Sequence, residues 1–175
     1  MSLDALRVLA HPLRMRILSL LTGTAMSAAE AARELGETQA NISYHVRRLH
    51  DAGLLDVAEE VHIRGGRAKR YRHHPDSGRR LTARDPAEEQ LLTMAIASEL
   101  LRRADSRAGA RPAALTDAEL WVDPQLWARL LEQSRQLSQE LHDAAQPPRT
   151  PGTVRVSASM ALFELTNPDS PEGRE

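Results

Sequence analysis

The chain has 175 residues, of which 41% are hydrophobic and 27% are charged, as is typical of globular proteins. Only 3% are aromatic and none is cysteine, which favours helices over a β-sandwich and excludes disulfides and thiolate metal or redox sites. No apolar run is long enough for a membrane span, and charged residues interrupt the first apolar stretch, which argues against a signal peptide. A cytoplasmic location is therefore expected.

The charge is divided unevenly along the chain. Residues 1–80 carry a net charge of +4 and residues 81–175 a net charge of −5, although the whole chain carries only −1. Within 61–80, seven basic residues face one acidic residue. A basic half suits a polyanionic partner. The charge alone is equally compatible with a solvated surface.

Three helices are predicted before residue 36. Leucines three residues apart indicate a short helix over 3–10. Pro12 suits the first turn of a second helix, which ends at Gly23. Ser27 and Glu30 have the spacing of a capping box and open a third helix.

A fourth helix is predicted from Thr38 to Gly53, where glycine ends it. The third and fourth helices have the spacing of a helix-turn-helix. Such a motif needs a small residue at the crossing, a glycine in the turn and an apolar residue on the second helix. Ala32, Gly36 and Ile42 meet these three needs at spacings of four and six residues.

The pattern after Gly53 changes from helical to extended. Apolar residues between 55 and 63 occur at mostly even spacings, Gly65-Gly66 marks a tight turn, and 68–73 is expected to return as a strand. Residues 1–80 are thus predicted to form a winged helix-turn-helix domain. The predicted fold class is mainly α with a small β-hairpin wing, that is, α+β.

One face of the fourth helix is left free if Ile42, Val46 and Leu49 point inward. A helix fits the DNA major groove, where Gln and Asn bind adenine and Arg binds guanine. For His45, which lies beside the apolar residues, a buried and hydrogen-bonded histidine is an equal alternative to a DNA contact. The candidate DNA-binding residues are Thr38, Gln39, Asn41, Ser43, Tyr44, His45, Arg47 and Arg48.

The hairpin over 61–73 supplies a second set of candidates. Arginines beside a helix-turn-helix suit contacts to phosphate or to the minor groove. Strand alternation predicts that Arg70 and Arg72 share one face and Lys69 and Tyr71 the other, so that not all of them reach DNA. The candidates here are Arg64, Arg67, Lys69 and Arg70, with Arg64 and Arg67 preferred.

Residues 81–165 are predicted to form a helical dimerisation region. A long helix over 86–103 has a broad apolar face, which favours a homodimer formed through these helices. Thr116 and Glu119 have the spacing of another capping box, and Asp123-Pro124 opens a last helix that ends before Pro147. A small-molecule effector of unknown identity for this region is left open.

The end of the chain is expected to be a strand and a tail. Residues 153–163 alternate as one face of a strand, whose partner is left open between this chain and the partner subunit. Trp121 and Trp127 are expected to fill a dimer core rather than a ligand pocket. Residues 166–175 are expected to be a disordered tail.

Three stretches together resemble the ArsR-type winged-helix regulators. They are ALRVLAHPLRMRIL over 5–18, ISYHVRRLHDAGLL over 42–55 and RGGRAKRYR over 64–72. The resemblance implies a homodimer on an inverted-repeat operator, usually as a repressor released by an effector.

The chain departs from the metal-sensing members of that family. It has no Cys-x-Cys pair, its C-terminal half holds only His142, and His73-His74 have no evident third ligand. No metal and no cofactor are therefore expected.

Two other classes of function remain as alternatives. A winged helix also serves as a protein–protein interaction module without DNA binding. An enzyme is not expected, because the chain has no nucleophile elbow, P-loop, HExxH or dinucleotide-binding motif.

Overall fold

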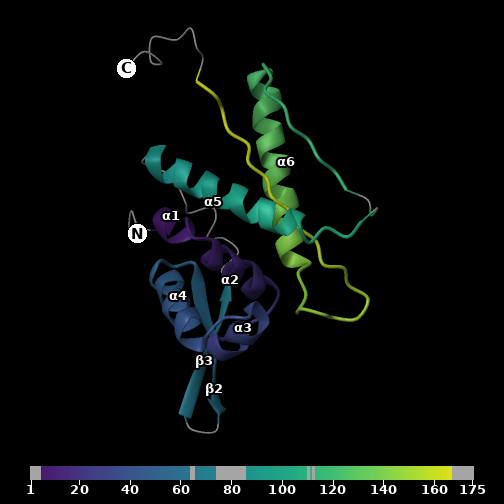
Figure 1. Cartoon of the computed structure of the whole chain (residues 1–175). Helices are drawn as coiled ribbons and strands as arrows, with labels where there is room; N and C mark the ends of the chain where they lie inside the picture. Colours follow the sequence, from purple (N-terminus) through teal and green to yellow (C-terminus); the bar gives the residue numbers. More distant parts are fainter. Residues whose placement is uncertain (1–4, 64–65, 74–85, 110, 112, 167–175) are drawn as a thin grey trace.

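A computed structural model describes residues 5–63, 66–73, 86–109, 111 and 113–166. Figure 1 shows a lower domain that ends in the wing, with two long helices above it. No described helix is both long and apolar enough to cross a membrane. The elements are α1 (Ala5–Leu9), α2 (Pro12–Gly23), β1 (Met26–Ser27), α3 (Ala28–Leu35), α4 (Gln39–Asp51), β2 (Leu55–Ile63), β3 (Gly66–His73), α5 (Pro86–Ala104) and α6 (Pro124–Asp143).

The caps predicted from the sequence set the helix boundaries of the lower domain. Pro12 begins α2, and Ser27 and Glu30 form the predicted capping box at the start of α3. Gly36 ends α3 with φ of +69°, a left-handed conformation that glycine adopts without strain. Thr38 caps α4, whose amide at Asn41 donates to the Thr38 hydroxyl. The helix-turn-helix prediction is confirmed at each of these points.

The core of the lower domain lies between α2, α4 and the start of the sheet. Ile42, Val46 and Leu49 are all buried, as their spacing predicts. Ile17 and Leu21 of α2 are fully buried against them. This packing fixes which face of α4 is turned outward.

The wing belongs to a three-stranded antiparallel sheet of order β1-β3-β2. The sequence predicts β2 and β3, but it does not reveal β1, in which Met26 pairs with Tyr71. Two residues are too few to show a period of two. A register irregularity lies between Val57 and Glu59 of β2. Bulges of this kind bend a strand and increase its twist.

Helix α5 rests on the lower domain, across α1 and α2 (Figure 1). Ala95 is buried at this contact and Leu92 packs against the core. The buried Glu88 carboxylate forms an ion pair with Arg7 of α1, with 3.0 Å between Oε1 and Nε. The α5 helix is thereby fixed to the lower domain.

A second buried carboxylate, that of Glu99, lies further along α5. Glu99 is 2% exposed and accepts hydrogen bonds from Arg102, the shortest of them 2.7 Å long. Burial opposes ionisation of Glu99, but the hydrogen bonds and positive charges of Arg102 and Arg103 outweigh it and lower the pKa. The carboxylate therefore remains charged and paired at neutral pH.

Helix α6 is attached mainly through the segment that follows it. The backbone of Gly23 lies so close to Gln146 that an added Cβ would come within 2.5 Å of its carbonyl oxygen. Arg149 forms a two-pronged hydrogen bond with the Glu34 carboxylate of α3, at 3.0 and 2.8 Å. By contrast, α6 itself has no buried residue.

One expectation for the C-terminal half is wrong, and two others concern contacts with a partner subunit. Thr116 and Glu119 do not open a helix, because residues 113–123 have no regular structure. Residues 153–163 pair with no other segment of the described chain, so that of the two partners left open for this strand only a partner subunit remains a prediction. Trp121 is 84% exposed in the single chain, and its place in a dimer core stays a prediction. The predicted tail lies mostly outside the described residues, which omit 74–85 and 167–175.

Candidate nucleic-acid interface

The outward face of α4 carries most of the predicted DNA-contacting residues. Ser43 is half-buried and Tyr44 is 51% exposed. The exposed side chains are those of Thr38, Gln39, Asn41, Tyr44, Arg47 and Arg48. Burial of the opposite face leaves this surface available to a partner.

The N-terminus of α4 offers hydrogen-bond donors without a competing negative charge in its first turn. The positive end of a helix dipole attracts phosphate. Just before the helix, the Glu37 carboxylate accepts a hydrogen bond of 3.2 Å from the Asn41 amide and lies 3.6 Å from Arg16. Glu37 therefore engages one of the two N–H donors of the Asn41 amide.

Arg47 lies along the exposed face of α4. Its Nε donates to the carbonyl oxygen of Ser43 at 3.2 Å, one helical turn earlier. The two terminal nitrogens have no hydrogen bond recorded within the described chain, so the end of the guanidinium is available for a guanine base. This geometry suits a two-pronged contact in the major groove.

His45 is a correction to the candidate set. It is 6% exposed, and its Nδ1 accepts a hydrogen bond from Nε of Arg14 at 3.1 Å. The His11 ring lies 4.7 Å away between centroids. Of the two alternatives considered for His45, the structure favours the buried and hydrogen-bonded one, so His45 does not lie on the exposed surface.

The environment of His11 and His45 predicts loss of stability in acid. Burial lowers the pKa of both imidazoles below the ordinary value of 6.5, and the positive charge of Arg14 lowers both further. The unfolded chain therefore takes up protons at a higher pH than the folded chain does. The stability contributed by the neutral rings is complete above pH 6.5 and is lost as the pH falls from there towards the folded pKa values.

Thermal unfolding between pH 8 and pH 5 measures this effect. In His45→Gln combined with His11→Asn, which retains a capping side chain at the start of α2, the fall in melting temperature between these pH values should be smaller. His62→Gln, at an exposed position on β2, should follow the parent. An unchanged acid dependence in the double variant would show that other groups cause it.

The wing presents cations whose charge is partly balanced across the strands. Arg67 forms an ion pair with Glu60, with 2.8 Å between the nitrogen and the oxygen, and Lys69 lies opposite Glu60 in the register. Both cations, like Arg72, are exposed. Arg64 lies outside the described residues. The balanced charges make the wing less cationic than its sequence alone indicates.

Arg70 is a second correction. Its side chain is only 29% exposed and binds two carboxylates, Glu59 at 2.6 Å and Glu30 at 3.2 Å. Burial opposes ionisation of Glu30, but hydrogen bonds from Ser27 together with Arg70 lower its pKa. Arg70 therefore holds the wing to α3. Arg72, two residues further along β3, is exposed, and its sharing of a face with Arg70 stays a prediction.

Sequence reasoning missed the residues that orient this surface. Arg14 of α2 donates both to His45 and to the carbonyl oxygen of Val8, and so holds α1, α2 and α4 together. Glu30 closes the capping box and also binds Arg70. The capping-box spacing predicted the role of Glu30 at the start of α3. Nothing in the sequence pattern indicated its contact with Arg70, 40 residues later.

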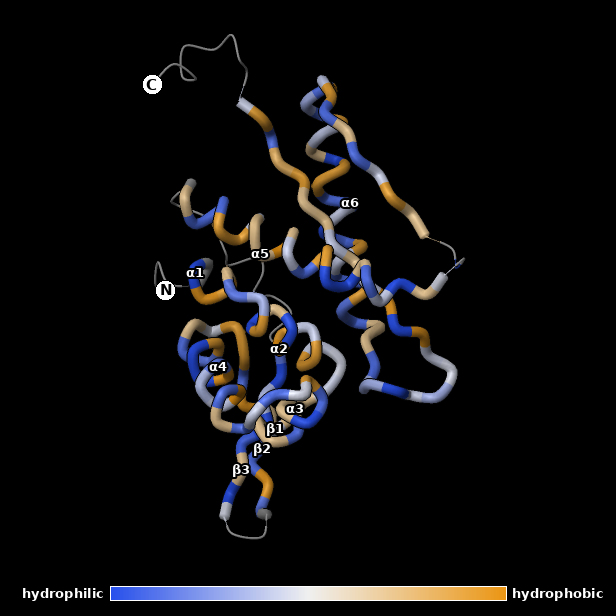
Figure 2. Tube along the Cα trace, viewed as in Figure 1, coloured by the Kyte–Doolittle hydropathy of each residue, from blue (hydrophilic) through white to orange (hydrophobic). Residues whose placement is uncertain are grey.

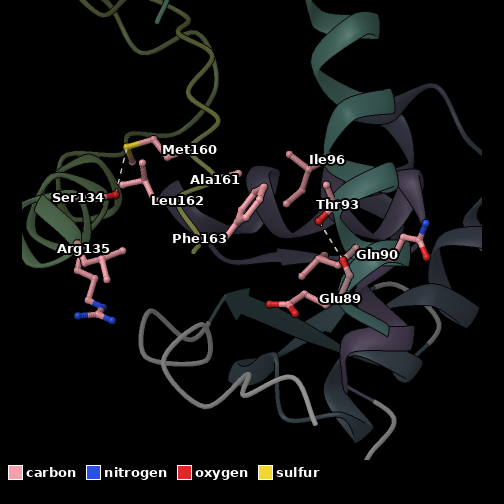
Figure 3. A pocket seen from close by; sticks show the side chains of 12 residues that line it. Glu89, Gln90, Thr93, Ile96, Ser134, Arg135, Met160, Ala161, Leu162 and Phe163 are labelled. Atoms are coloured by element: carbon pink, nitrogen blue, oxygen red, sulfur yellow. Dashed lines mark hydrogen bonds between the residues drawn. The ribbon is translucent and has the colours of Figure 1, made fainter. Parts of the chain in front are cut away.

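An open groove lies away from this surface, between α5, α6 and residues 160–163. Its volume is about 630 Å³, and Figure 3 shows Thr93 and Ile96 on the α5 side with Ser134 and Arg135 on the α6 side. Leu92, Ile96 and Leu131 give it apolar walls, with Glu89 and Arg135 also among its lining residues.

Comparison with known proteins agrees with the geometry of the lower domain. A family model described as a helix-turn-helix domain matches residues 9–58, from the end of α1 into β2. This range contains the motif and the whole of α4. No curated protein is similar enough to the chain to count as a match. The chain therefore contains a helix-turn-helix domain within an α+β winged fold, which is typical of DNA-binding regulators.

Proposed function

We propose that this protein is a sequence-specific transcriptional regulator that binds an inverted-repeat DNA operator as a homodimer. The observation that supports it most is the outward face of α4, where Gln39, Tyr44 and Arg47 are exposed because Ile42 and Leu49 are buried. In this proposal α4 enters the major groove and its first residues meet the bases.

The wing takes the second role in the proposed complex. Arg67 and Lys69 of the hairpin, with Arg64 at its tip by sequence, contact the phosphate backbone or the minor groove. The ion pair between Arg67 and Glu60 is exposed, and exposed pairs contribute only about 0–1 kcal/mol, so that exchange of Glu60 for phosphate is inexpensive.

Homodimerisation is supported by the C-terminal half. Helix α6 has no buried residue although Leu130, Leu137 and Leu141 form an apolar row on it. A two-fold protein also suits an operator built from two inverted half-sites. The resemblance to ArsR-type regulators supports repression released by an effector, for which the groove between α5 and α6 offers space. The proposal includes no metal and no catalytic step.

Binding measurements with two arginine variants test the proposal. Arg47→Ala is expected to weaken operator binding by about 1–3 kcal/mol and to reduce the preference for operator over unrelated DNA. Arg67→Ala is expected to weaken binding to every sequence alike, because phosphate contacts carry no base information. Fluorescence anisotropy with the DNA upstream of the chain's own gene measures both.

A matched control separates charge from position. Arg129→Ala removes the same charge from an exposed site on α6 and should leave both affinity and preference unchanged. If the parent binds no duplex DNA in a salt-dependent way, the DNA-binding proposal fails and a protein–protein interaction module becomes the better account.

A further inference from the structure

The exposed apolar surface of the chain is concentrated in its C-terminal half. Apart from Tyr44, every large exposed hydrophobic residue in the described chain falls between 91 and 165. Figure 2 shows these hydrophobic stretches along α5, α6 and the segment that follows. Such an apolar surface indicates an interface.

The segment 153–165, here called the strap, has the pattern of a strand without a partner. Apolar and polar residues alternate from Val154 to Met160. Within the described residues, no backbone group of 154–165 is hydrogen-bonded to another backbone group. An extended edge of this kind is a template for pairing with another chain.

The strap is only loosely joined to its own helices. Its one side-chain hydrogen bond to them within the described chain is weak, from the hydroxyl of Ser134 to the sulfur of Met160 at 3.7 Å (Figure 3). Residues 160–163 form one wall of the groove of about 630 Å³, and 158–160 line another of about 260 Å³. The strap therefore borders two open spaces instead of filling a core.

We propose that the strap pairs antiparallel with the strap of a second copy of this chain, forming a two-stranded ribbon at the dimer axis. The inference rests on the proposed homodimer and goes beyond it by naming the segment that joins the subunits. The ribbon lies over α5 and α6, which supply the apolar support that a two-stranded ribbon needs in water.

Symmetry favours a second strap as the partner. Across a two-fold axis the same surface contacts itself, and residues opposite each other in an antiparallel pair point to the same face. The apolar faces of the two straps therefore coincide. Another unpaired stretch, 113–122, is less suitable because it has no alternating run like that of 154–160.

Proline substitutions along the strap test this pairing. Each position from 154 to 159 is changed singly to proline. The control at each position is alanine, except at Ala158, where the control is serine. In a two-stranded ribbon every second amide N–H faces the partner, and proline has none. Analytical ultracentrifugation is expected to show loss of the dimer relative to the control at alternate positions only. Circular dichroism checks that the helices remain folded.

Single cysteines provide an independent readout. Because the chain has no cysteine, a disulfide in any single-cysteine variant joins two chains. Under mild oxidation, cross-linking should peak at one place in the strap and fall away on both sides, since only residues near the axis meet their own copies. Exposed Ser106→Cys, beyond the end of α5, serves as the control and should not cross-link.

The outcomes distinguish a failure of strap pairing from a failure of the proposed homodimer. A dimer that survives every proline, with no cross-link along the strap, overturns strap pairing but retains the homodimer. A parent chain that is monomeric at all concentrations overturns both. In either case, salt-dependent binding to duplex DNA reports separately on the DNA-binding proposal.

Discussion

Ile42→Ala is expected to lower the free energy of unfolding by about 2–5 kcal/mol. Ile42 is fully buried at the crossing of the helix-turn-helix, so truncation removes apolar contacts and leaves a cavity. Small domains have only about 5–15 kcal/mol of stability in total. Chemical denaturation followed by circular dichroism measures the change as a lower midpoint.

The same variant should bind operator DNA more weakly, because a fraction of the molecules no longer holds α4 in place. Gln39→Ala is the matched control on the opposite, exposed face of the helix. It should change stability by no more than about 0.5 kcal/mol while weakening DNA binding. Equal destabilisation by the two substitutions would contradict the assignment of the buried and exposed faces.

The helix-turn-helix could be predicted from sequence because local residues determine it. Ser27 with Glu30, the left-handed Gly36 and the cap at Thr38 each act within a few residues of their partners. The spacing of Ile42 and the residues after it then gives the orientation of α4. Such short-range rules do not depend on how distant parts of the chain meet.

Pairings between distant segments could not be predicted in the same way. Arg70 was expected to contact DNA, but it binds Glu30 from α3 and Glu59 from β2. In the sequence, each of these acidic residues looks like an ordinary surface residue. The strand β1, which brings α3 to the wing, has only two residues and therefore shows no alternation of apolar and polar residues. His45 depended similarly on Arg14, 31 residues earlier.

The C-terminal half limits prediction for a different reason. The alternation over 153–163 is characteristic of a strand, but a strand exists only when another segment supplies hydrogen bonds. The capping spacing at Thr116 and Glu119 did not open a helix, because Asp123 is extended before Pro124, which begins α6, and the stretch between is too short for a stable helix. Only the caps of α6, with Asp123 accepting from two amides, were determined locally.

Operator affinity is expected to fall by about 10³- to 10⁵-fold between 50 and 200 mM salt, as for proteins that neutralise about 6–10 phosphates. With Arg70 and His45 removed from the candidates, the exposed basic residues on α4 and β3 in each described chain are Arg47, Arg48, Arg67, Lys69 and Arg72. Two chains bring these cations to one operator in the proposed dimer. Anisotropy titrations across this range give the slope directly.

The slope also distinguishes an exposed arginine of the wing from one that is paired with carboxylates. Arg72→Gln removes one exposed cation per chain, or two per dimer, and should make the logarithmic slope shallower by about 2. Arg70→Gln should leave the slope closer to that of the parent, because Glu30 and Glu59 already neutralise this side chain. It should instead lower stability, since both carboxylates lose their partner. The reverse pattern would return Arg70 to the DNA-contacting surface and assign Arg72 to the fold.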